Sequence, residues 1–366
     1  MRLTQLRLHD FRNYAQVTLM PPGGVTVFVG ENGAGKTNLL EAIHLCCLGR
    51  SHRTSFDRDM IRLGCRTSAV YARVKRQVTR DEVGVRLFSQ QSLRKTIYVN
   101  GKTVPRIGEL MGHMTCVMFS PEDMSIVKGA PQVRRGFLDM LLSQCQPAYF
   151  YALQSYHAAL KQRNALIKQL AKQRGDLNQL EVWDEQLAKT AVPIVRMRRE
   201  AVLTLSDLAK EHYTFISGRQ PEVFVLRYQS SLSGPGDPGE ALMDQLTASR
   251  EDDLRRLTTG TGPHRDDLRL VLSGQEMRGF ASQGQMRTAV LAMRLAEINI
   301  LTQAHKDAPL LLLDDVLSEL DEGRRARLMG SLGGMQTLLT TTDLHILAGM
   351  QPECVLKVAE GKVFSA

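Results

Sequence analysis

The sequence predicts an α/β protein: a mixed β-sheet with helices, an antiparallel β subdomain and an inserted α-helical hairpin arm. Three observations lead to this prediction. An apolar, β-branched run at residues 25–29 is followed by a glycine-rich turn and a helical pattern. Residues 68–104 have strand periodicity, whereas residues 132–217 have helical periodicity. A second apolar run, at residues 310–313, predicts another buried parallel strand.

The N-terminal part of the chain is predicted to be mostly strand, because short alternating or apolar runs are bounded by Pro, Gly and Asn. Asn100-Gly101 is typical of a two-residue hairpin turn. After the last of these runs, Ser120 is expected to cap a helix that begins at Pro121. The predicted strands are residues 2–8, 17–19, 25–29, three runs within 68–104, and 116–119.

The middle of the chain changes to helical periodicity. From residue 132 to residue 217, apolar side chains recur at helical spacing, and Gly175 interrupts the pattern. We therefore expect a long antiparallel helical hairpin inserted into the α/β fold. The C-terminal part returns mainly to strands, which are predicted at residues 223–228, 268–272, 276–280, 310–313, 337–342, 355–358 and 362–364.

The chain carries a net charge of +9, and the excess is concentrated in one region. Residues 50–106 contain 14 Lys and Arg residues but only four acids, which gives +10 there and −1 in the remainder. A concentrated basic region is typical of a nucleic-acid interface, although a solvated charged face would explain it as well. Arg73, Lys75 and Arg76 lie on the predicted sheet within this region and are the candidate DNA contacts.

Composition also bounds the cellular context. Six cysteines show neither a C-x-x-C pair nor metal-ligand spacing, so we expect no disulfide framework and no zinc site. No run approaches the ~18 uninterrupted apolar residues of a membrane span, and the N-terminus has no apolar signal region. We therefore expect a cytoplasmic protein in a reducing compartment, with no membrane partner.

The candidate chemistry begins at the turn after residues 25–29. Residues 30–37 read GENGAGKT, which fits the phosphate-loop pattern G-x-x-x-x-G-K-[ST]. In such a loop, backbone N–H groups and the helix N-terminus bind phosphate. Lys36 is expected to reach the β- and γ-phosphates, and Thr37 to bind Mg²⁺. The candidate nucleotide-binding residues here are Gly30, Glu31, Asn32, Gly33, Ala34, Gly35, Lys36, Thr37 and Asn38.

Two acids, Asp314 and Asp315, end the apolar run at residues 310–313. Ligands of α/β proteins bind at the carboxyl ends of strands. In a phosphate-loop protein the first acid holds Mg²⁺ and the second orients or deprotonates the attacking water. Asp314 is therefore a candidate metal ligand together with Thr37, and Asp315 is a candidate catalytic residue together with Lys36.

Two further segments allow more than one interpretation. A helix is predicted from about residue 283, and Ser282 with Gln285 fits the reciprocal cap S-x-x-[EQ]. A plain helix cap would explain both residues, so this spacing alone assigns no ligand. Upstream, a Gly-Pro turn is followed by His264 and Arg265, which are either phosphate contacts or structural residues of the turn.

These motifs, taken together, resemble the ATP-binding-cassette ATPases and, more narrowly, the SMC/Rad50-like branch. Within that branch the chain is similar to the RecF family of bacterial DNA replication and repair proteins. The order of a phosphate loop, a distant S-x-G-Q helix start and LLLLDD-V-LSELD carries the resemblance. The matching segments run from end to end of the chain and are residues 10–14, 30–37, 49–54, 119–123, 134–135 with 137–139, 262–266, 282–285 and 314–321.

The resemblance implies an ABC-type ATPase head that binds ATP and Mg²⁺ and closes head to tail as a homodimer. Ser282, with Gly284 and Gln285, would contact the γ-phosphate held by Lys36 of the other copy, and Asp321 would line the same interface. The resemblance also implies a DNA partner (single-stranded, gapped or duplex) bound at single-strand gaps. It further implies cooperation with RecO and RecR, support of RecA, roles in recombination, replication restart and the SOS response, and a weak, DNA-stimulated ATPase activity.

Some positions depart from the wider cassette pattern. Asp315 stands where many cassette ATPases have Glu, and its shorter side chain predicts slow hydrolysis. The usual Gln before the helical lobe has only Glu122 or Asp123 as substitutes. Residues 340–343 occupy the place of the switch His, with His345 as the candidate replacement.

The predicted segments are the N-terminal half of the ATPase head, 1–125, a helical insertion or arm lobe, 126–255, and the C-terminal half of the head, 256–366. Two other functions share the motifs. An ATPase subunit of an ABC transporter would need neither the basic sheet nor the helical insertion, and it would fractionate with a membrane complex. A small-molecule kinase would need neither the distant acidic strand nor the S-Q-G-Q helix start.

Overall fold

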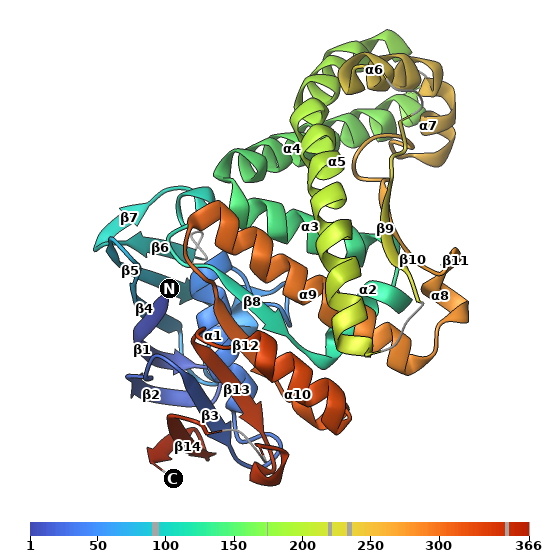
Figure 1. Ribbon diagram of the computed structural model, residues 1–366. Coiled ribbons are helices and arrows are strands. Elements are labelled where there is room, and N and C mark those ends of the chain that lie inside the picture. The colour runs from blue at the N-terminus through green and yellow to red at the C-terminus, as the bar shows by residue number, and fades with distance from the viewer. Residues whose placement is uncertain (90–94, 174, 219–221, 233–235, 348–350, 366) are drawn as a thin grey trace. The chain divides into compact units, whose positions relative to one another are not determined.

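The computed structural model describes residues 1–89, 95–173, 175–218, 222–232, 236–347 and 351–365. The chain forms two compact units, and Figure 1 labels most of their helices and strands. The first unit contains Met1–Asp123, His212–Arg219 and Val290–Ala366, and the second contains Met124–Glu211 and Gln220–Ala289.

The first unit is built on a six-stranded sheet of order β15-β14-β3-β13-β12-β8. All neighbours in this sheet are parallel except the terminal β14–β15 pair. Strands β8 and β12 are buried along their whole length, which is why their sequences are continuous apolar runs. The strands are β3 (Val25–Val29), β8 (Cys116–Phe119), β12 (Leu310–Asp314), β13 (Thr337–Thr341), β14 (Cys354–Ala359) and β15 (Lys362–Ser365).

A second, antiparallel sheet of order β2-β1-β4-β5-β6-β7 confirms the predicted β subdomain. Asn100 and Gly101 both have positive φ, 51° and 77°, and join β6 to β7 as predicted. Helix α1 (Lys36–Leu48) contacts strands of both sheets and so packs between them. The strands are β1 (Arg2–Phe11), β2 (Tyr14–Leu19), β4 (Thr67–Lys75), β5 (Arg80–Phe88), β6 (Lys95–Val99) and β7 (Lys102–Val104).

The remaining elements of this unit are short helical segments, and one of them corrects a prediction. The helix expected at Pro121 begins there as the 3₁₀ turn η3 and continues directly into α2 (Ser125–Lys128). The predicted cap is reversed, because the Ser120 N–H donates to the Asp123 carboxylate at 3.0 Å. The segments are η1 (Asp57–Met60), η2 (Ile107–Glu109), η3 (Pro121–Met124), η5 (Val316–Glu319), α10 (Glu322–Ser331) and η6 (Leu344–Leu347).

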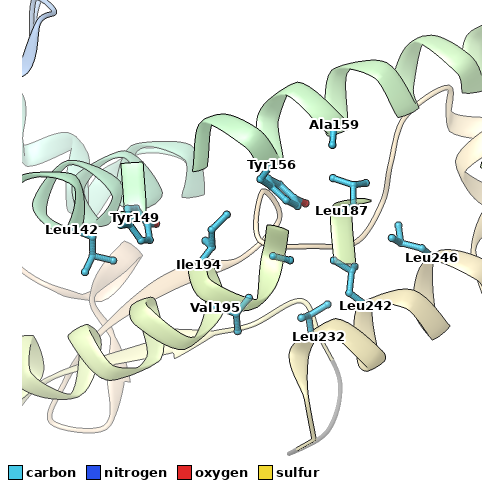
Figure 2. Close-up of a cluster of buried hydrophobic side chains, with 11 residues drawn as sticks. Leu142, Tyr149, Tyr156, Ala159, Leu187, Ile194, Val195, Leu232, Leu242 and Leu246 are labelled. Carbon is cyan, nitrogen blue, oxygen red and sulfur yellow. The ribbon is translucent and has the colours of Figure 1, made fainter. Parts of the chain in front are cut away.

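The second unit contains the predicted helical hairpin. Its helices α4 and α5 are 27 and 37 residues long, and α5 continues into the first unit. The break between them includes Gly175, as predicted. Tyr149, Tyr156 and Ile194 belong to its apolar core (Figure 2). The helices are α2 (Ser125–Lys128), α3 (Pro131–Cys145), α4 (Pro147–Gln173), η4 (Leu177–Leu180) and α5 (Glu181–Ser217).

A small antiparallel sheet of order β11-β10-β9 completes this unit. The strand predicted at 276–280 is wrong, because pairing ends at Glu276 and Gly279 has a φ of 97°, outside the strand region. Helices α6 and α7 were not predicted. The elements are β9 (Phe224–Gln229), α6 (Pro238–Ala248), α7 (Arg250–Arg256), β10 (Asp267–Leu272), β11 (Gln275–Glu276), α8 (Met277–Phe280) and α9 (Gln283–His305), which enters the first unit.

The predicted boundary at residue 256 differs from this division of the chain. Residues 256–289 belong to the second unit rather than to the C-terminal half of the head. The reason is that β10 pairs along its whole length with β9, so the two strands on either side of residue 256 form one sheet.

A buried ion-pair network joins α4, α5 and α7 within the second unit. The Arg163 guanidinium donates to the carboxylates of Asp184 and Asp253 at 2.6 Å each, and all three side chains are at most 1% exposed. Thr259 also accepts a hydrogen bond from Arg163, whereas the Arg163 Nη2 atom has no partner among the described residues. Among the helices that the structure describes, none is both long enough and apolar enough to cross a membrane.

Candidate nucleotide-binding site

The predicted phosphate loop connects β3 to α1 at the carboxyl end of β3, the edge where α/β proteins bind ligands. Two of its glycines are required by close packing. A Cβ atom on Gly30 would lie 2.2 Å from the Val358 carbonyl oxygen, and one on Gly35, which has a φ of 113°, would lie 2.4 Å from the Asn13 side chain. The exposed tip of the loop consists of Glu31, Asn32 and Gly33.

Asn13, in the turn between β1 and β2, braces this loop. Its Nδ2 donates to the Ala34 carbonyl at 2.9 Å, and its Oδ1 accepts from the Asn38 side chain at 2.9 Å. The neighbouring Tyr14 hydroxyl donates to the Gly35 carbonyl at 3.0 Å. Sequence reasoning had found this turn only as part of a family resemblance, because nothing local to it indicates a contact with the loop.

The Lys36 ammonium lies against the loop backbone and is only 7% exposed. Its Nζ donates to the carbonyl oxygens of Gly30 and Glu31 at 2.7 and 2.8 Å, and it has no ion pair within the described part of the chain. Burial lowers the pKa of Lys36, and the charges of Asp315 and Asp314 partly offset this effect. Because a phosphate binds a cation more strongly than a carbonyl does, we expect the ammonium to leave these carbonyls when a nucleotide binds.

The two predicted metal ligands lie side by side although they are 277 residues apart in the chain. The Asp314 Oδ1 atom accepts from the Thr37 hydroxyl at 2.8 Å and from the Thr340 hydroxyl at 2.7 Å. Alcohol and carboxylate oxygens next to a phosphate loop suit Mg²⁺, which takes its other ligands from phosphate and water. No group of three or more His, Cys, Asp or Glu among the described residues is arranged to hold a metal by itself.

Asp315 follows the strand in a left-handed conformation with a φ of 51°, and its N–H donates to the Thr340 hydroxyl at 3.0 Å. Its Oδ1 atom is buried and has no hydrogen-bond partner in the described part of the chain. A buried carboxylate oxygen without a donor is costly. The atom therefore fits a place where a water molecule or a ligand group would bind, while its catalytic role stays a prediction.

The positions that depart from the cassette pattern have defined surroundings. Arg294 donates to both oxygens of Asp123 at 2.6 and 3.1 Å, so Asp123 is already paired, whereas Glu122 is exposed. His345 is also exposed. Thr340, in the segment that takes the place of the switch His, instead contacts the acidic pair, and no sequence signal identified that contact.

His52 is a second residue that sequence reasoning missed. Its Nδ1 atom is buried and lacks a hydrogen-bond partner among the described residues. Burial lowers the pKa of His52, and the charges of Glu41 and Asp314 oppose this effect, which places the ring near the nucleotide site. Only the family resemblance of residues 49–54 pointed to this segment.

Ser282 and Gln285 form the predicted reciprocal cap at the start of α9. The Ser282 N–H donates to the Gln285 side chain at 2.8 Å, and the Gln285 N–H donates to the Ser282 hydroxyl at 3.2 Å. Gly284 belongs to the first turn, and its carbonyl accepts from the Thr288 hydroxyl. Ser282 is exposed, so its hydroxyl is accessible to a further ligand, but binding of a nucleotide by these residues stays a prediction.

Asp321 has a structural role as the cap of α10. Its carboxylate accepts from the Arg324 N–H at 2.9 Å and also pairs with the Arg324 guanidinium. The hydrogen bond from the Arg324 backbone is the main reason that the pKa of Asp321 is lowered. The side chain is 55% exposed, and its predicted place at a dimer interface stays a prediction.

The three candidate DNA contacts differ in their surroundings. Arg73 is exposed but forms an ion pair with Glu82 on β5. Arg76 is partly buried and donates to the Gly112 carbonyl at 2.7 Å, so part of its hydrogen-bonding capacity serves the fold.

Lys75 lies in a row of positive charge across three strands. In the antiparallel register, Arg2 of β1 and Arg80 of β5 lie directly opposite Lys75 on either side. All three are exposed, and none has an ion pair in the part of the chain that the structure describes. Like charges at directly opposed positions destabilise a sheet, so this row favours an anionic partner.

Comparison with known proteins identifies the family. A model described as the RecF/RecN/SMC N terminal domain matches residues 2–361. A protein of Lactobacillus delbrueckii subsp. bulgaricus named DNA replication and repair protein RecF is 42% identical over 356 residues, covering 95% of this chain and 92% of that protein. A protein of the same name from Ruminiclostridium cellulolyticum is 37% identical over 347 residues, covering 94% and 93%.

Solved structures agree with this. A structure described as the recombination mediator protein RecF with ATP in the RecFOR pathway has a TM-score of 0.92 and 32% identity, and covers 100% of this chain and 97% of that chain. An SMC head bound to the C-winged helix domain of ScpA has a TM-score of 0.57 and 17% identity, which shows a shared fold. The predicted ATPase-head architecture with a helical arm is thereby confirmed.

Proposed function

The chain belongs to the RecF/RecN/SMC family, and from this premise we propose that it is an ATP-switched, DNA-binding recombination mediator of DNA replication and repair. We further propose that it acts in the cytoplasm at single-strand gaps, with RecO and RecR, and supports RecA loading and SOS induction. The relatives reported above are named for DNA replication and repair, which favours neither the transporter nor the kinase alternative.

The observation that carries the ATP-binding step is the contact between Thr37 and Asp314 beside the buried Lys36. Lys36 would exchange the loop carbonyls for phosphate oxygens, and the glycine-rich backbone would donate its N–H groups to them. Thr37 and Asp314 would hold Mg²⁺, which neutralises phosphate charge when it is bound. Asp315 would accept a hydrogen bond from the attacking water through its unpartnered oxygen.

Ser282 supplies the other half of the proposed site. It lies at the exposed start of α9, and the cap leaves its hydroxyl hydrogen free to donate. We place this hydroxyl against the γ-phosphate held by a second copy of the chain, so that ATP acts mainly as a dimerisation ligand. Because Asp315 reaches less far than a Glu would, hydrolysis is slow and resets the dimer rather than driving it.

The row of Arg2, Lys75 and Arg80 supplies the proposed DNA contact. Exposed cations without carboxylate partners attract phosphate and release the counterions of DNA when they bind. Arg73 joins this surface at its edge, although its ion pair with Glu82 reduces its contribution. Arg76 contributes less to DNA binding than a fully free arginine would, because its guanidinium also donates to the Gly112 backbone carbonyl.

Self-association tests the ATP switch. Light scattering after gel filtration is expected to show a monomer without nucleotide and a dimer with ATP–Mg²⁺ and a gapped duplex. Lys36→Arg and Ser282→Asn should each weaken the dimer, and Asn keeps the helix cap while removing the hydroxyl. If the wild-type chain stays monomeric with saturating ATP–Mg²⁺ and DNA, the switch is refuted.

Mixing the two variants tests the composite site. In a head-to-tail dimer of one Lys36→Arg chain and one Ser282→Asn chain, one site keeps both the native lysine and the native serine. The mixture should therefore dimerise more than either variant alone. If the mixture dimerises no more than either variant alone, the two residues act in the same copy or the serine does not contact the nucleotide.

Salt dependence of DNA binding tests the basic row. Lys75→Gln and Arg80→Gln should each lower the slope of log affinity against log salt by about 0.9 on duplex DNA, because each removes one phosphate contact. Arg255→Gln is the matched control, since that exposed arginine pairs with Asp252 on α7. Equal slopes for all three variants would place the DNA surface elsewhere.

A further inference from the structure

The second unit contains a cavity of about 280 Å³ that the proposed ATP switch does not use. Its walls come from helices α3, α4 and α5 and from the Gly-Pro turn before β10. Besides the Tyr156 hydroxyl, the polar side chains that line it are Gln132, Arg135, Asp139, His157, Arg198 and His264.

Two successive arginines on α3 have different partners, and the difference points to the cavity. Arg134 is buried and donates to both oxygens of Asp267 at 2.7 and 2.8 Å. Arg135 lines the cavity and has a single hydrogen bond among the described residues, from Nη1 to the Asp266 carbonyl at 2.7 Å. Its other guanidinium nitrogens therefore have no partner from the described part of the chain.

A second guanidinium increases the positive potential at Arg135. Arg198 is 2% exposed and donates to the Asp139 carboxylate at 2.7 Å and to the Pro263 carbonyl at 2.7 Å. Burial, followed by the charge of Arg198, lowers the pKa of Arg135, and nearby aspartates oppose this effect. Asp139 is the carboxylate that lines the cavity, and its contacts with Arg198 and the Tyr149 hydroxyl offset its charge.

His264 lines the cavity, but both of its ring nitrogens are already hydrogen-bonded, so neither is free to bind a ligand. Its Nε2 donates to the Thr259 carbonyl at 3.1 Å, because a carbonyl can only accept, and its Nδ1 therefore accepts from the Tyr156 hydroxyl at 2.6 Å. Tyr156 is one of the core residues labelled in Figure 2. Arg265 is also engaged, since it donates twice to the Thr259 carbonyl. Both residues named by the sequence as possible phosphate contacts thus hold the turn.

We propose that this cavity binds one phosphoryl group, with Arg135 as its main contact and His157 and Gln132 beside it. The Nε and Nη2 atoms of Arg135, which have no partner among the described residues, form one edge of the guanidinium, and such an edge matches two oxygens of a phosphate in a bidentate pairing. His157 and Gln132 are exposed and have no hydrogen bond within the described residues, so their N–H groups are available to the same phosphate. The cavity is large enough for a phosphoryl group and part of the molecule that carries it, either a DNA backbone or a free nucleotide.

Inorganic phosphate is the direct probe. The experiment uses the full chain with Lys36→Ala, which weakens phosphate binding at the nucleotide loop, and its result does not depend on the ATP switch. With about 10 mM phosphate in place of chloride at equal ionic strength, the unfolding midpoint should rise by about 2 °C. Arg135→Gln should remove at least half of this rise, and Arg135→Lys should keep part of it.

The matched control is Arg196→Gln, which removes the same charge from an exposed position on α5 in the same unit. Because each variant is compared with itself in chloride, a general loss of stability cancels. If Arg135→Gln gains as much from phosphate as Arg196→Gln does, the proposal is refuted, whatever happens to DNA binding.

A short DNA duplex distinguishes the two sources of the phosphoryl group. If Arg135→Gln loses the phosphate response and also binds duplex about fivefold more weakly than Arg196→Gln, the ligand is the DNA backbone. If it loses the phosphate response and binds DNA as the control does, the ligand is a free phosphate or nucleotide. Both outcomes support the cavity as a phosphoryl site.

Discussion

The nucleotide site of the first unit and the ion-pair network of the second unit both bury a cation, but only the network pairs its cation with carboxylates. In the network, the Arg163 guanidinium has carboxylates of Asp184 and Asp253 at 2.6 Å. In the nucleotide site, Lys36 has only carbonyl oxygens, and one Asp315 oxygen has no partner among the described residues. A buried charge is costly unless it is paired. The difference teaches that the fold itself pairs the buried cation of the network with carboxylates, whereas the nucleotide site leaves its cation for a ligand to pair.

The largest expected effect breaks the network side of this comparison. Arg163→Met should lower the free energy of unfolding by about 3–5 kcal/mol, because it leaves the buried Asp253 carboxylate without a cation and Asp184 with Arg250 alone. Urea denaturation followed by circular dichroism measures this loss. Arg196→Met removes an exposed arginine paired with Asp237 and should change the midpoint little. Similar losses of unfolding free energy for the two variants would mean that the buried network stabilises the fold no more than an exposed ion pair does.

A smaller effect extends the comparison to a neutral buried group on α1. Burial lowers the pKa of His44 from 6.5 to about 3, and its Nδ1 lies 3.1 Å from the Arg50 carbonyl. The pKa of His44 is lower in the folded state than in the unfolded state. Burying the neutral ring therefore costs no stability above about pH 6.5, and stability is lost as the pH falls from 6.5 towards 3. By about pH 5 this loss should reach about 2 kcal/mol of unfolding free energy.

The His44→Gln variant isolates this contribution, because Gln does not titrate. Its unfolding free energy should fall less than that of the wild type when denaturation curves are compared near neutral pH and at about pH 5. His345→Gln removes an exposed histidine of the same unit and should leave the difference unchanged. If both variants keep the full wild-type loss, His44 is not the group responsible.

The smallest expected effect on stability concerns Lys36 in the nucleotide site. Lys36→Met should leave the stability of the nucleotide-free chain unchanged or raise it by about 1 kcal/mol, because an ammonium without a carboxylate partner is removed from a buried site. The lowered pKa of Lys36 has the same sign: its charge opposes folding until the pH rises through the folded pKa towards 10.5. Urea denaturation without nucleotide measures the change.

Nucleotide should reverse the order of stability of the wild-type chain and Lys36→Met. With ATP–Mg²⁺ present, the wild-type chain should gain stability and Lys36→Met should not, because only the native state with its lysine binds the ligand tightly. A clear loss of stability in Lys36→Met without nucleotide would show that the lysine supports the fold, and would remove the contrast with Arg163.

Sequence reasoning located the candidate site well where the signal is local. The phosphate loop, the reciprocal cap of Ser282 and Gln285 and the turn at Asn100 all depend on residues within a few positions of each other. The strand expected at 276–280 failed for a local reason too, because its pairing ends at Glu276. There, Gly279 with a φ of 97° is incompatible with a continued strand.

The sequence by itself determined which segments become strands and helices and which motif residues carry phosphate chemistry, because periodicity and turn geometry act over short distances along the chain. Only the tertiary structure decided which charges find partners. Arg134 meets a carboxylate whereas Arg135 beside it does not, and Thr340 contacts Asp314 across neighbouring strands. These pairings join residues up to hundreds of positions apart, and packing of whole elements, rather than residue type, brings them within hydrogen-bonding distance.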